Sequence, residues 1–262
     1  MPSVNNFGLP SSYKSRPQPD YFVDSSGQPD SDVVWQPDVY NTVAKLAKTV
    51  GAETIIDIGC GRGGKLVALK DDFKVVGIDY GSNIEFCRTE FPFGTWDEID
   101  LESEGAELPL SQDQLSGAAI VCSDVIEHLI NPLPLVHLIQ RSLEHAHLAV
   151  ISTPDRQLFR GFLHKGPPVN HFHVREWALH EFSSFLASEG CQILHSGVTQ
   201  SHSKSDQKKT CLIVLRGAKM TDETAKRITA LLPAPPTPLR YTWTVTERTI
   251  RRMFTHSGKS SN

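Results

Sequence analysis

A short apolar strand that runs directly into a glycine-rich turn is the feature that most constrains the fold of this chain. Residues 54–64 read Thr-Ile-Ile-Asp-Ile-Gly-Cys-Gly-Arg-Gly-Gly, and a second apolar stretch at 74–79 ends in Asp79. Glycines let the backbone turn tightly and let a ligand lie against bare main chain. An acid at the end of the next strand can accept hydrogen bonds from a ribose diol. The order strand, glycine-rich turn, helix, strand, acid therefore predicts a half-Rossmann unit with a nucleotide-type cofactor site.

An acid on the strand side of the turn separates this unit from phosphate-binding relatives. The chain has no Gly-Lys-Ser/Thr sequence, which argues against a P-loop. The string Asp57-Ile58-Gly59-Cys60-Gly61 closely resembles motif I of the class I, Rossmann-like methyltransferases that depend on S-adenosylmethionine. That cofactor has no phosphate and carries a sulfonium and an ammonium, so an acid beside the turn is physically sensible. The resemblance implies cofactor contacts at the amino-acid end from Asp57, Gly59 and Gly61, with Cys60 beside them, and at the ribose from Asp79, with Tyr80 next to it.

Two later segments agree with this resemblance. Residues 94–102 lie where the family places an acid and an apolar residue around adenine, which implies that Asp100 accepts from the amino group and that Ile99 or Leu101 packs on the ring. An apolar strand at 118–122 runs into Ser123 and Asp124, and ligands of open parallel sheets lie beyond such carboxyl ends. The following Val-Ile-Glu-His-Leu is similar to motif IV of the small-molecule branch that includes the ubiquinone O-methyltransferases.

The alternation of strands and helices predicts an α/β, Rossmann-like fold with helices on both faces of a mostly parallel seven-stranded sheet. We expect a C-terminal antiparallel hairpin, as in the resembled family. The expected strands are 54–58, 74–79, 94–98, 118–122, 147–152, 191–196 and 211–215; the expected helices are 39–50, 63–70, 82–90, 132–142, 176–189 and 222–232.

Three regions follow from this pattern. Residues 1–38 are rich in Pro, Ser, Asp and Asn and predict an irregular segment, which by resemblance is a lid whose Gln36 contacts the cofactor. Residues 39–216 form the cofactor-binding methyltransferase domain. Residues 217–262 give a helix, a proline-rich linker at 233–238 and a basic tail that frays at its end.

Composition excludes several classes of protein. The 262 residues carry a net charge of -4, which leaves no overall basic footprint, so nucleic acid is not the expected partner. No apolar run approaches the length of a membrane span, and no signal peptide is recognisable, so we expect a cytoplasmic protein without a membrane partner. Five scattered cysteines without a Cys-x-x-Cys predict neither a disulfide framework nor a zinc ribbon. The sequence gives no oligomeric state.

The segment 166–177 follows the fifth strand, where these enzymes build the substrate side of the active site. A histidine here can remove a proton from a hydroxyl, because its ordinary pKa lies close to cellular pH. We predict His171, and less firmly His173, as the catalytic base. The alternative is a scaffold role, in which His173 braces the following helix and Arg175 pairs with Glu176.

The predicted function is transfer of a methyl group from S-adenosylmethionine, leaving S-adenosylhomocysteine, to a hydroxyl of a small-molecule or saccharide acceptor. A divalent-metal-dependent RNA 2′-O-methyltransferase is an alternative, because Glu127-His128 with a later histidine loosely resembles the ligand set of the small-RNA methyltransferases. We expect no metal, since the first acid of that set is here the shorter Asp124. A non-catalytic S-adenosylmethionine-binding protein is the other alternative.

Overall fold

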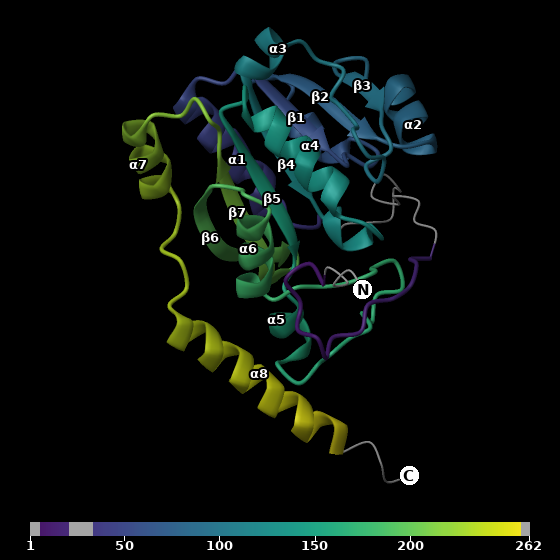
Figure 1. Ribbon diagram of the computed structural model, residues 1–262, viewed down its shortest axis with the longest axis vertical. Helices are drawn as coiled ribbons and strands as arrows, with labels where there is room; N and C mark the ends of the chain where they lie inside the picture. Colours follow the sequence, from purple (N-terminus) through teal and green to yellow (C-terminus); the bar gives the residue numbers. More distant parts are fainter. Residues whose placement is uncertain (1–5, 21–33, 258–262) are drawn as a thin grey trace.

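A single seven-stranded sheet runs through the domain, with helices on both faces (Figure 1). The computed structural model describes residues 6–20 and 34–257. The strands are β1 (Thr54–Ile58), β2 (Lys74–Asp79), β3 (Thr95–Glu98), β4 (Ala118–Ser123), β5 (Leu148–Pro154), β6 (Ile193–His202) and β7 (Ser205–Arg216).

The strand order is β3-β2-β1-β4-β5-β7-β6. Neighbouring strands from β3 to β5 are parallel, whereas β7 is antiparallel to both β5 and β6. This confirms the predicted α/β fold with a mostly parallel sheet and an antiparallel pair late in the chain. The chain progresses outward from β1 through β2 to β3 and then returns to place β4 on the other side of β1. Such a reversal of strand order opens a crevice outside the carboxyl ends of the two strands, where ligands of these folds bind.

Two apolar clusters, one on each face, hold the helices to the sheet. One face carries α1 (Pro37–Val50), η1 (Gly64–Leu69), α2 (Ser82–Glu90) and α7 (Asp222–Leu231), and the other carries α3 (Gln112–Ser116), α4 (Leu133–Leu143) and α6 (Leu179–Ser188). Alternation along β1 sends Ile55 into the first cluster and Ile56 and Ile58 into the second. All three are fully buried, and each such side chain contributes about 1.5–3 kcal/mol of transfer free energy.

Several elements differ from their predicted bounds. The helix predicted at 63–70 is the short 3-10 helix η1, which begins after Gly63 in the left-handed conformation. The hairpin is longer than predicted, because β6 and β7 extend to a tight turn at 203–204. Helix α6 begins at Leu179 rather than 176, since Trp177 pairs with Asp155 in an isolated bridge. The pattern did not predict α3, α5 (Arg156–Arg160) or η2 (Ile126–His128), each five residues or fewer.

The C-terminal region is more regular than the predicted linker and basic tail. Residues 238–257 form the 20-residue helix α8 (Pro238–Ser257), which crosses the lower end of the domain in Figure 1. Its attachment is a tertiary contact, because Tyr241 donates a hydrogen bond to the buried Asp155 at 2.8 Å. Among the described residues, no helix is both long and apolar enough to cross a lipid bilayer.

Residues 6–20 lie along the loop between α5 and α6. Backbone hydrogen bonds join Lys14 to Lys165 and Arg16 to Val174, and the Tyr13 hydroxyl accepts from the amide of Glu176. Tyr13 is buried, so this segment is part of the folded domain. Two other aromatic residues of the N-terminal segment, Tyr21 and Phe22, lie outside the described residues.

Candidate cofactor and acceptor site

A cavity of about 730 Å³ opens at the carboxyl ends of β1, β2 and β4. This is the crevice expected from the strand order. Nine of the eleven predicted cofactor-binding residues line it, and the other two, Gln36 and Asp57, lie beneath its wall. The nine are Gly59, Cys60, Gly61, Asp79, Tyr80, Asp100, Leu101, Ser123 and Asp124.

The glycine-rich turn forms the floor of the cavity. Gly59 has a φ of +80°, and a Cβ there would lie 2.2 Å from a methyl of Val125. Only glycine fits such a position without strain. The amide of Gly61 donates to Asp79 Oδ2 at 2.7 Å, so the turn after β1 is tied to the end of β2. The two predicted halves of the cofactor site are therefore held in one piece.

Asp79 has the geometry needed to recognise a diol. Its Oδ1 accepts from the amide of Tyr80 at 2.8 Å and from the Asn83 side chain at 3.1 Å. These bonds fix the carboxylate at the cavity wall, and two carboxylate oxygens offer about four lone-pair sites in total. Asp79 also lines the cavity, so the hydroxyls of a ribose bound there would lie within reach of this carboxylate.

The wall beyond Asp79 suits a flat, partly apolar ring. Ile99, Asp100 and Leu101 line it in succession after β3. Asp100 Oδ1 accepts from the amide of Glu102 at 2.9 Å, which holds the loop in a compact turn. An acid flanked by two aliphatic side chains is the combination predicted for the adenine ring.

Gln36 supports the cavity from below. It is 2% exposed, and its Oε1 accepts from the hydroxyls of Ser123, at 3.1 Å, and of Ser152. The start of α1 is thereby attached to the ends of β4 and β5. Gln36 and the cavity-lining Asp124 have φ values of +50° and +58°, a conformation that costs free energy in residues other than glycine. Strain of this kind gathers at functional sites, so both positions support a ligand site here.

Asp57 lies under the turn, where its Oδ2 accepts from the Tyr40 hydroxyl at 2.8 Å. Burial raises the pKa of this carboxyl to about 7, while the Tyr40 hydrogen bond and the charge of Lys65 act against the rise. Tyr40 and Lys65 themselves line the cavity. A cation at this end of the cavity would favour the ionised form of Asp57. Its direct contact with a cofactor stays a prediction.

The two predicted catalytic histidines lie away from the cavity lining formed by the described residues. His171 is 70% exposed, with Nδ1 3.6 Å from the carboxylate of Asp20. His173 is buried, with Nδ1 2.8 Å from Glu176 Oε1 and Nε2 2.9 Å from the Asn170 side chain. These contacts agree with the alternative of a brace for the segment before α6. The ion pair expected between Arg175 and Glu176 is wrong, because the Arg175 guanidinium binds the carbonyls of Leu129 and Ile130.

His128 is the histidine that lines the cavity. Its Nδ1 lies 2.8 Å from the carbonyl of Phe172, so Nδ1 carries the proton in the neutral ring and Nε2 carries the lone pair. Burial, with the nearby His173 as a second cause, lowers the pKa of His128 to about 4. In the sequence, His128 stood out only as part of the motif IV resemblance and of the Glu-His pair in the alternative metal site. Its cavity position depends on η2, a turn that the apolar pattern did not reveal.

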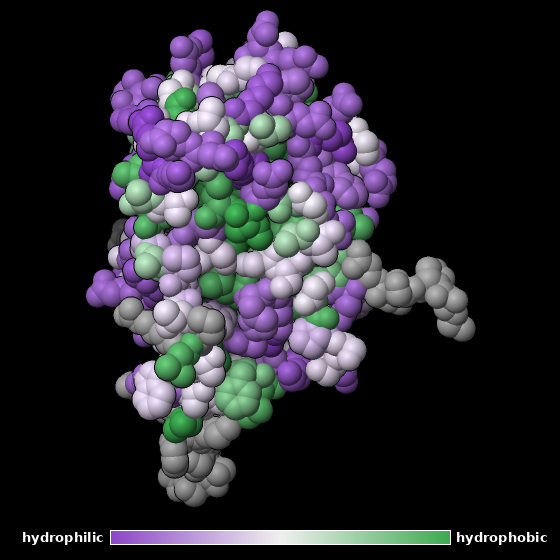
Figure 2. Space-filling model, turned by 60° about the vertical axis from the view of Figure 1, so that its left-hand side comes forward, coloured by the Kyte–Doolittle hydropathy of each residue, from purple (hydrophilic) through white to green (hydrophobic). Residues whose placement is uncertain are grey.

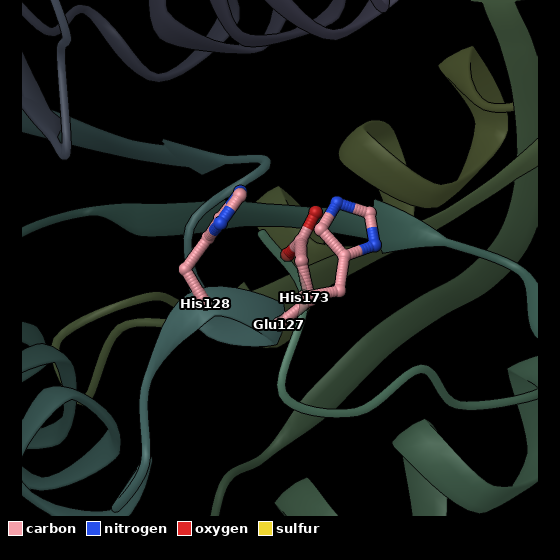
Figure 3. Close-up of side chains that lie close together, drawn as sticks. All are labelled: Glu127, His128 and His173. Atoms are coloured by element: carbon pink, nitrogen blue, oxygen red, sulfur yellow. The ribbon is translucent and has the colours of Figure 1, made fainter. Parts of the chain in front are cut away.

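Glu127, His128 and His173 come together at the edge of the cavity, with one potential ligand atom from each within 4.8 Å of the others (Figure 3). Burial and the nearby Asp124 carboxyl raise the pKa of Glu127. A shared proton or a cation would relieve the repulsion between these two acids. The donor set of one carboxylate and two imidazoles suits a divalent ion. Binding would require His173 to exchange a present hydrogen bond for the metal.

Apolar residues outside the predicted cofactor-binding set also line the cavity. Its lining includes Val34 and Trp35 before α1, and Leu129 and Ile130 after η2. Trp35 packs edge-on against His202 at the hairpin turn. These residues come from three separate stretches of chain. The sequence pointed to this part of the lining only through the expectation that an N-terminal segment covers the cofactor.

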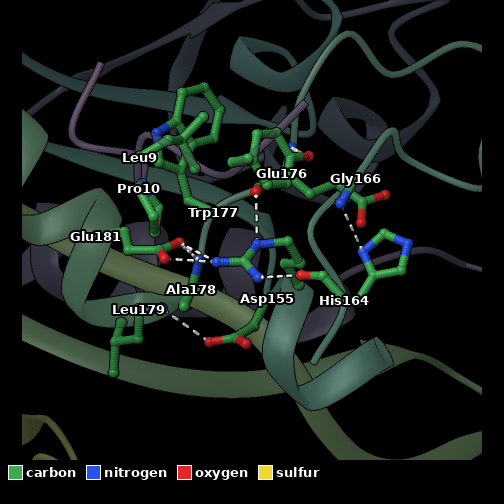
Figure 4. A network of polar contacts seen from close by, with 12 residues as sticks. Leu9, Pro10, Asp155, His164, Gly166, Glu176, Trp177, Ala178, Leu179 and Glu181 are labelled. Atoms are coloured by element: carbon green, nitrogen blue, oxygen red, sulfur yellow. Dashed lines mark hydrogen bonds and ion pairs between the residues drawn. The ribbon is translucent and has the colours of Figure 1, made fainter. Parts of the chain in front are cut away.

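A buried ion pair holds the loop whose Phe172 carbonyl meets His128. Arg156 and Glu181 are almost fully buried, with Nη2 2.6 Å from Oε2 (Figure 4). The same guanidinium donates to the carbonyls of His164 and Glu176 and lies over the ring of Tyr13. One cation therefore joins the N-terminal segment, the 161–177 loop and α6.

The profile of a family described as "Methyltransferase domain" matches residues 37–202, more than half of the chain. The chain therefore belongs to the methyltransferase domain family. A curated protein of Mycobacterium tuberculosis (strain CDC 1551 / Oshkosh), described as a probable S-adenosylmethionine-dependent methyltransferase, is 29% identical over 150 residues. The alignment covers 56% of this chain and 51% of the relative, and a protein of strain H37Rv with the same description gives the same values. This chain thus spans about half the length of the curated relatives it matches.

Solved structures agree on the fold. The methyltransferase domain of bacterial CtHen1-C has a TM-score of 0.50 at 20% identity, covering 69% of this chain and 97% of that domain. A structure described as the complex between the Haloferax volcanii Trm112 methyltransferase activator and "the putative methyltransferase" has a TM-score of 0.50 at 14% identity. The match covers 70% of this chain and 92% of the solved one. At such identities the similarity shows the fold alone. The family assignment confirms the predicted class and S-adenosylmethionine as its cofactor; the ubiquinone-like branch stays a prediction.

Proposed function

We propose that this protein transfers the methyl group of S-adenosylmethionine to a hydroxyl of a small-molecule or saccharide acceptor. The observation that carries the proposal is one cavity lined both by the predicted cofactor residues and by further, mostly apolar residues. The glycine turn and Asp79 belong to the first group, and Trp35, His128 and Ile130 belong to the second, which we assign to the acceptor. A largely apolar pocket with a few polar groups suits a small ligand.

S-adenosylmethionine supplies an electrophilic methyl group when bound. The chain's own contribution is to align the acceptor and exclude water, and alignment alone can supply much of such a rate enhancement. The acceptor gains the methyl group and loses one proton. We assign that proton to His128 Nε2, because His128 lines the cavity and its Nδ1 proton is directed to Phe172. The lowered pKa keeps Nε2 of the ring unprotonated at neutral pH, and it also makes this imidazole a weaker base than an ordinary histidine.

The test is a screen of saccharides, phenols and short RNAs with S-adenosylhomocysteine release as the readout. With an accepted substrate, His128→Gln should lower kcat by about 10²-fold or more, the usual contribution of a positioned base. His171→Gln and His173→Gln serve as parallel variants, because the sequence predicts those residues for the same role. If one of these two variants lost kcat to that extent while His128→Gln kept normal activity, the catalytic base would be His171 or His173 instead.

The second candidate is a divalent-metal-dependent RNA 2′-O-methyltransferase. Its support is the approach of Glu127, His128 and His173. Turnover restricted to RNA 3′ ends and abolished by a chelator would favour it over the small-acceptor proposal. Cofactor binding without turnover of any acceptor would instead favour the non-catalytic alternative.

A further inference from the structure

Helix α8 is fixed to the domain through one of its faces. Val245 and Thr249 are buried there, and Tyr241 reaches Asp155. Arg248 donates from Nη1 to the carbonyl of Leu158 at 3.0 Å. These contacts use the side of the helix that faces α5, and the other described residues leave its outer side uncovered.

The outer side of α8 carries large apolar side chains. Leu239, Trp243 and Ile250 are 82%, 71% and 47% exposed, and their spacing of four and seven residues places them in one stripe. Phe162 and Leu163 are also exposed and lie next to the helix, since the Phe162 amide donates to Thr249 Oγ1. Figure 2 shows apolar side chains gathered at this lower end of the molecule. We call these five residues the α8 patch. Contiguous exposed apolar surface of this kind marks an interaction site.

The charge of α8 is opposite to that of the rest of the chain. Residues 238–257 contain four arginines and one glutamate, a formal charge of +3, while the whole chain carries -4 and the remainder therefore -7. A second copy docked through the same helix would bring these arginines together. An anionic surface instead complements both the charge and the apolar stripe.

We propose that the α8 patch docks the protein on the surface of an anionic lipid bilayer, with Leu239 and Trp243 entering the headgroup region. A helix with exposed Trp and Leu side chains and a net positive charge is suited to this position, because the apolar residues enter the interface and the charge is attracted to lipid phosphates. Trp is favoured at the membrane interface. This replaces the expectation of no membrane partner, which considered spanning segments only. The proposal does not depend on the identity of the methyl acceptor.

Docking through α8 would hold the edge of the sheet with the carboxyl end of β5 near the membrane. Tyr241 bonds to Asp155, which directly follows the carboxyl end of β5. The cavity opens at the same edge of the sheet.

The experiment is flotation of the full chain with vesicles of phosphatidylcholine alone or mixed with phosphatidylglycerol. We expect binding to the anionic vesicles only, weakened by added salt. The double variant Leu239→Ser/Trp243→Ser should bind these vesicles more weakly than wild type by on the order of tenfold or more, because the apolar area that enters the bilayer is lost. Leu231→Ser, an exposed leucine on α7, is the matched control and should bind as wild type.

Calorimetry with S-adenosylmethionine on each variant confirms that the fold is intact, and light scattering gives the oligomeric state. Absence of flotation with anionic vesicles overturns the proposal, as does equal binding by the double variant. A dimer that the double variant dissociates, together with no vesicle binding, assigns the α8 patch to a second copy instead.

Discussion

The cofactor end and the acceptor end of the cavity are built in different ways. At the cofactor end, Gly59, Gly61 and Asp79 come from one β1-turn-β2 unit of about 25 residues. At the proposed acceptor end, Trp35 and His128 come from segments far apart in sequence, and Arg156 binds the 161–177 loop, whose Phe172 carbonyl meets the His128 ring. Short-range geometry defines the first end and long-range packing the second. The cofactor end is therefore expected to tolerate damage to the scaffold better than the acceptor end.

The largest expected effect is on the scaffold of the acceptor end. Glu181→Ala leaves the buried Arg156 guanidinium without its carboxylate, and breaking a buried pair costs about 3–5 kcal/mol. We expect that loss in the free energy of urea unfolding. Asp72→Ala removes the exposed pair with Lys48 and should cost no more than about 1 kcal/mol. Equal losses in the two variants would contradict a structural role for Arg156.

The next effect is at the cofactor end. Gly59→Ala forces a Cβ to within 2.2 Å of Val125 at a φ of +80°, which should cost about 2–5 kcal/mol and abolish cofactor binding. Gly64→Ala is the control, because a Cβ there meets nothing within 4 Å. Its stability should be unchanged or raised by up to about 1 kcal/mol. Thermal unfolding with calorimetry measures both, and a well-folded, cofactor-binding Gly59→Ala protein would show that the turn is not constrained.

The third effect is a pH dependence of cofactor affinity. Asp57, with a pKa of about 7, must lose its proton to favour a bound cation, so affinity should fall as the pH drops below 7, by up to about tenfold per unit. Calorimetry in buffers of different ionisation enthalpy should detect proton release. The Asp57→Asn protein should show neither trend. A pH-dependent affinity that persists in Asp57→Asn would assign the proton to another group.

The free protein gives an independent check of the same carboxyl. A pKa raised from 3.8 to about 7 means that the folded state holds a proton that the unfolded state has lost. The stability contributed by protonated Asp57 is complete below pH 3.8 and is lost as the pH rises through 7. Relative to Asp57→Asn, the free energy of unfolding of wild type should therefore fall by up to about 1.4 kcal/mol per pH unit between pH 3.8 and 7.

Local pattern was enough to predict most of the cofactor end. The spacing from Asp57 to Gly61 and the acid at Asp79 identified the turn and the two strands that flank it, because a strand, a tight turn and a second strand lie close together in sequence. The central strands β1, β4 and β5 were predictable because they are apolar runs that are almost fully buried.

The remainder depends on contacts that no local pattern records. Gln36 was predicted as a cofactor contact, yet its side chain is occupied by serines from β4 and β5. His128 reaches the cavity through the three-residue turn η2. The last 20 described residues form helix α8, which is attached to the domain through the hydrogen bond from Tyr241 to Asp155. These two residues are more than 80 positions apart in sequence.

The most direct test of the central claim is titration calorimetry with S-adenosylmethionine and S-adenosylhomocysteine. Wild type should bind both in the micromolar range, on the order of -8 kcal/mol. Asp79→Ala should bind about a hundredfold more weakly, because hydrogen bonds to a charged partner contribute about 1.5–3 kcal/mol each. Asp71→Ala, which removes an exposed acid beside Lys70, should bind as wild type. No binding by wild type, or equal binding by Asp79→Ala, would contradict the assignment of this cavity to the cofactor.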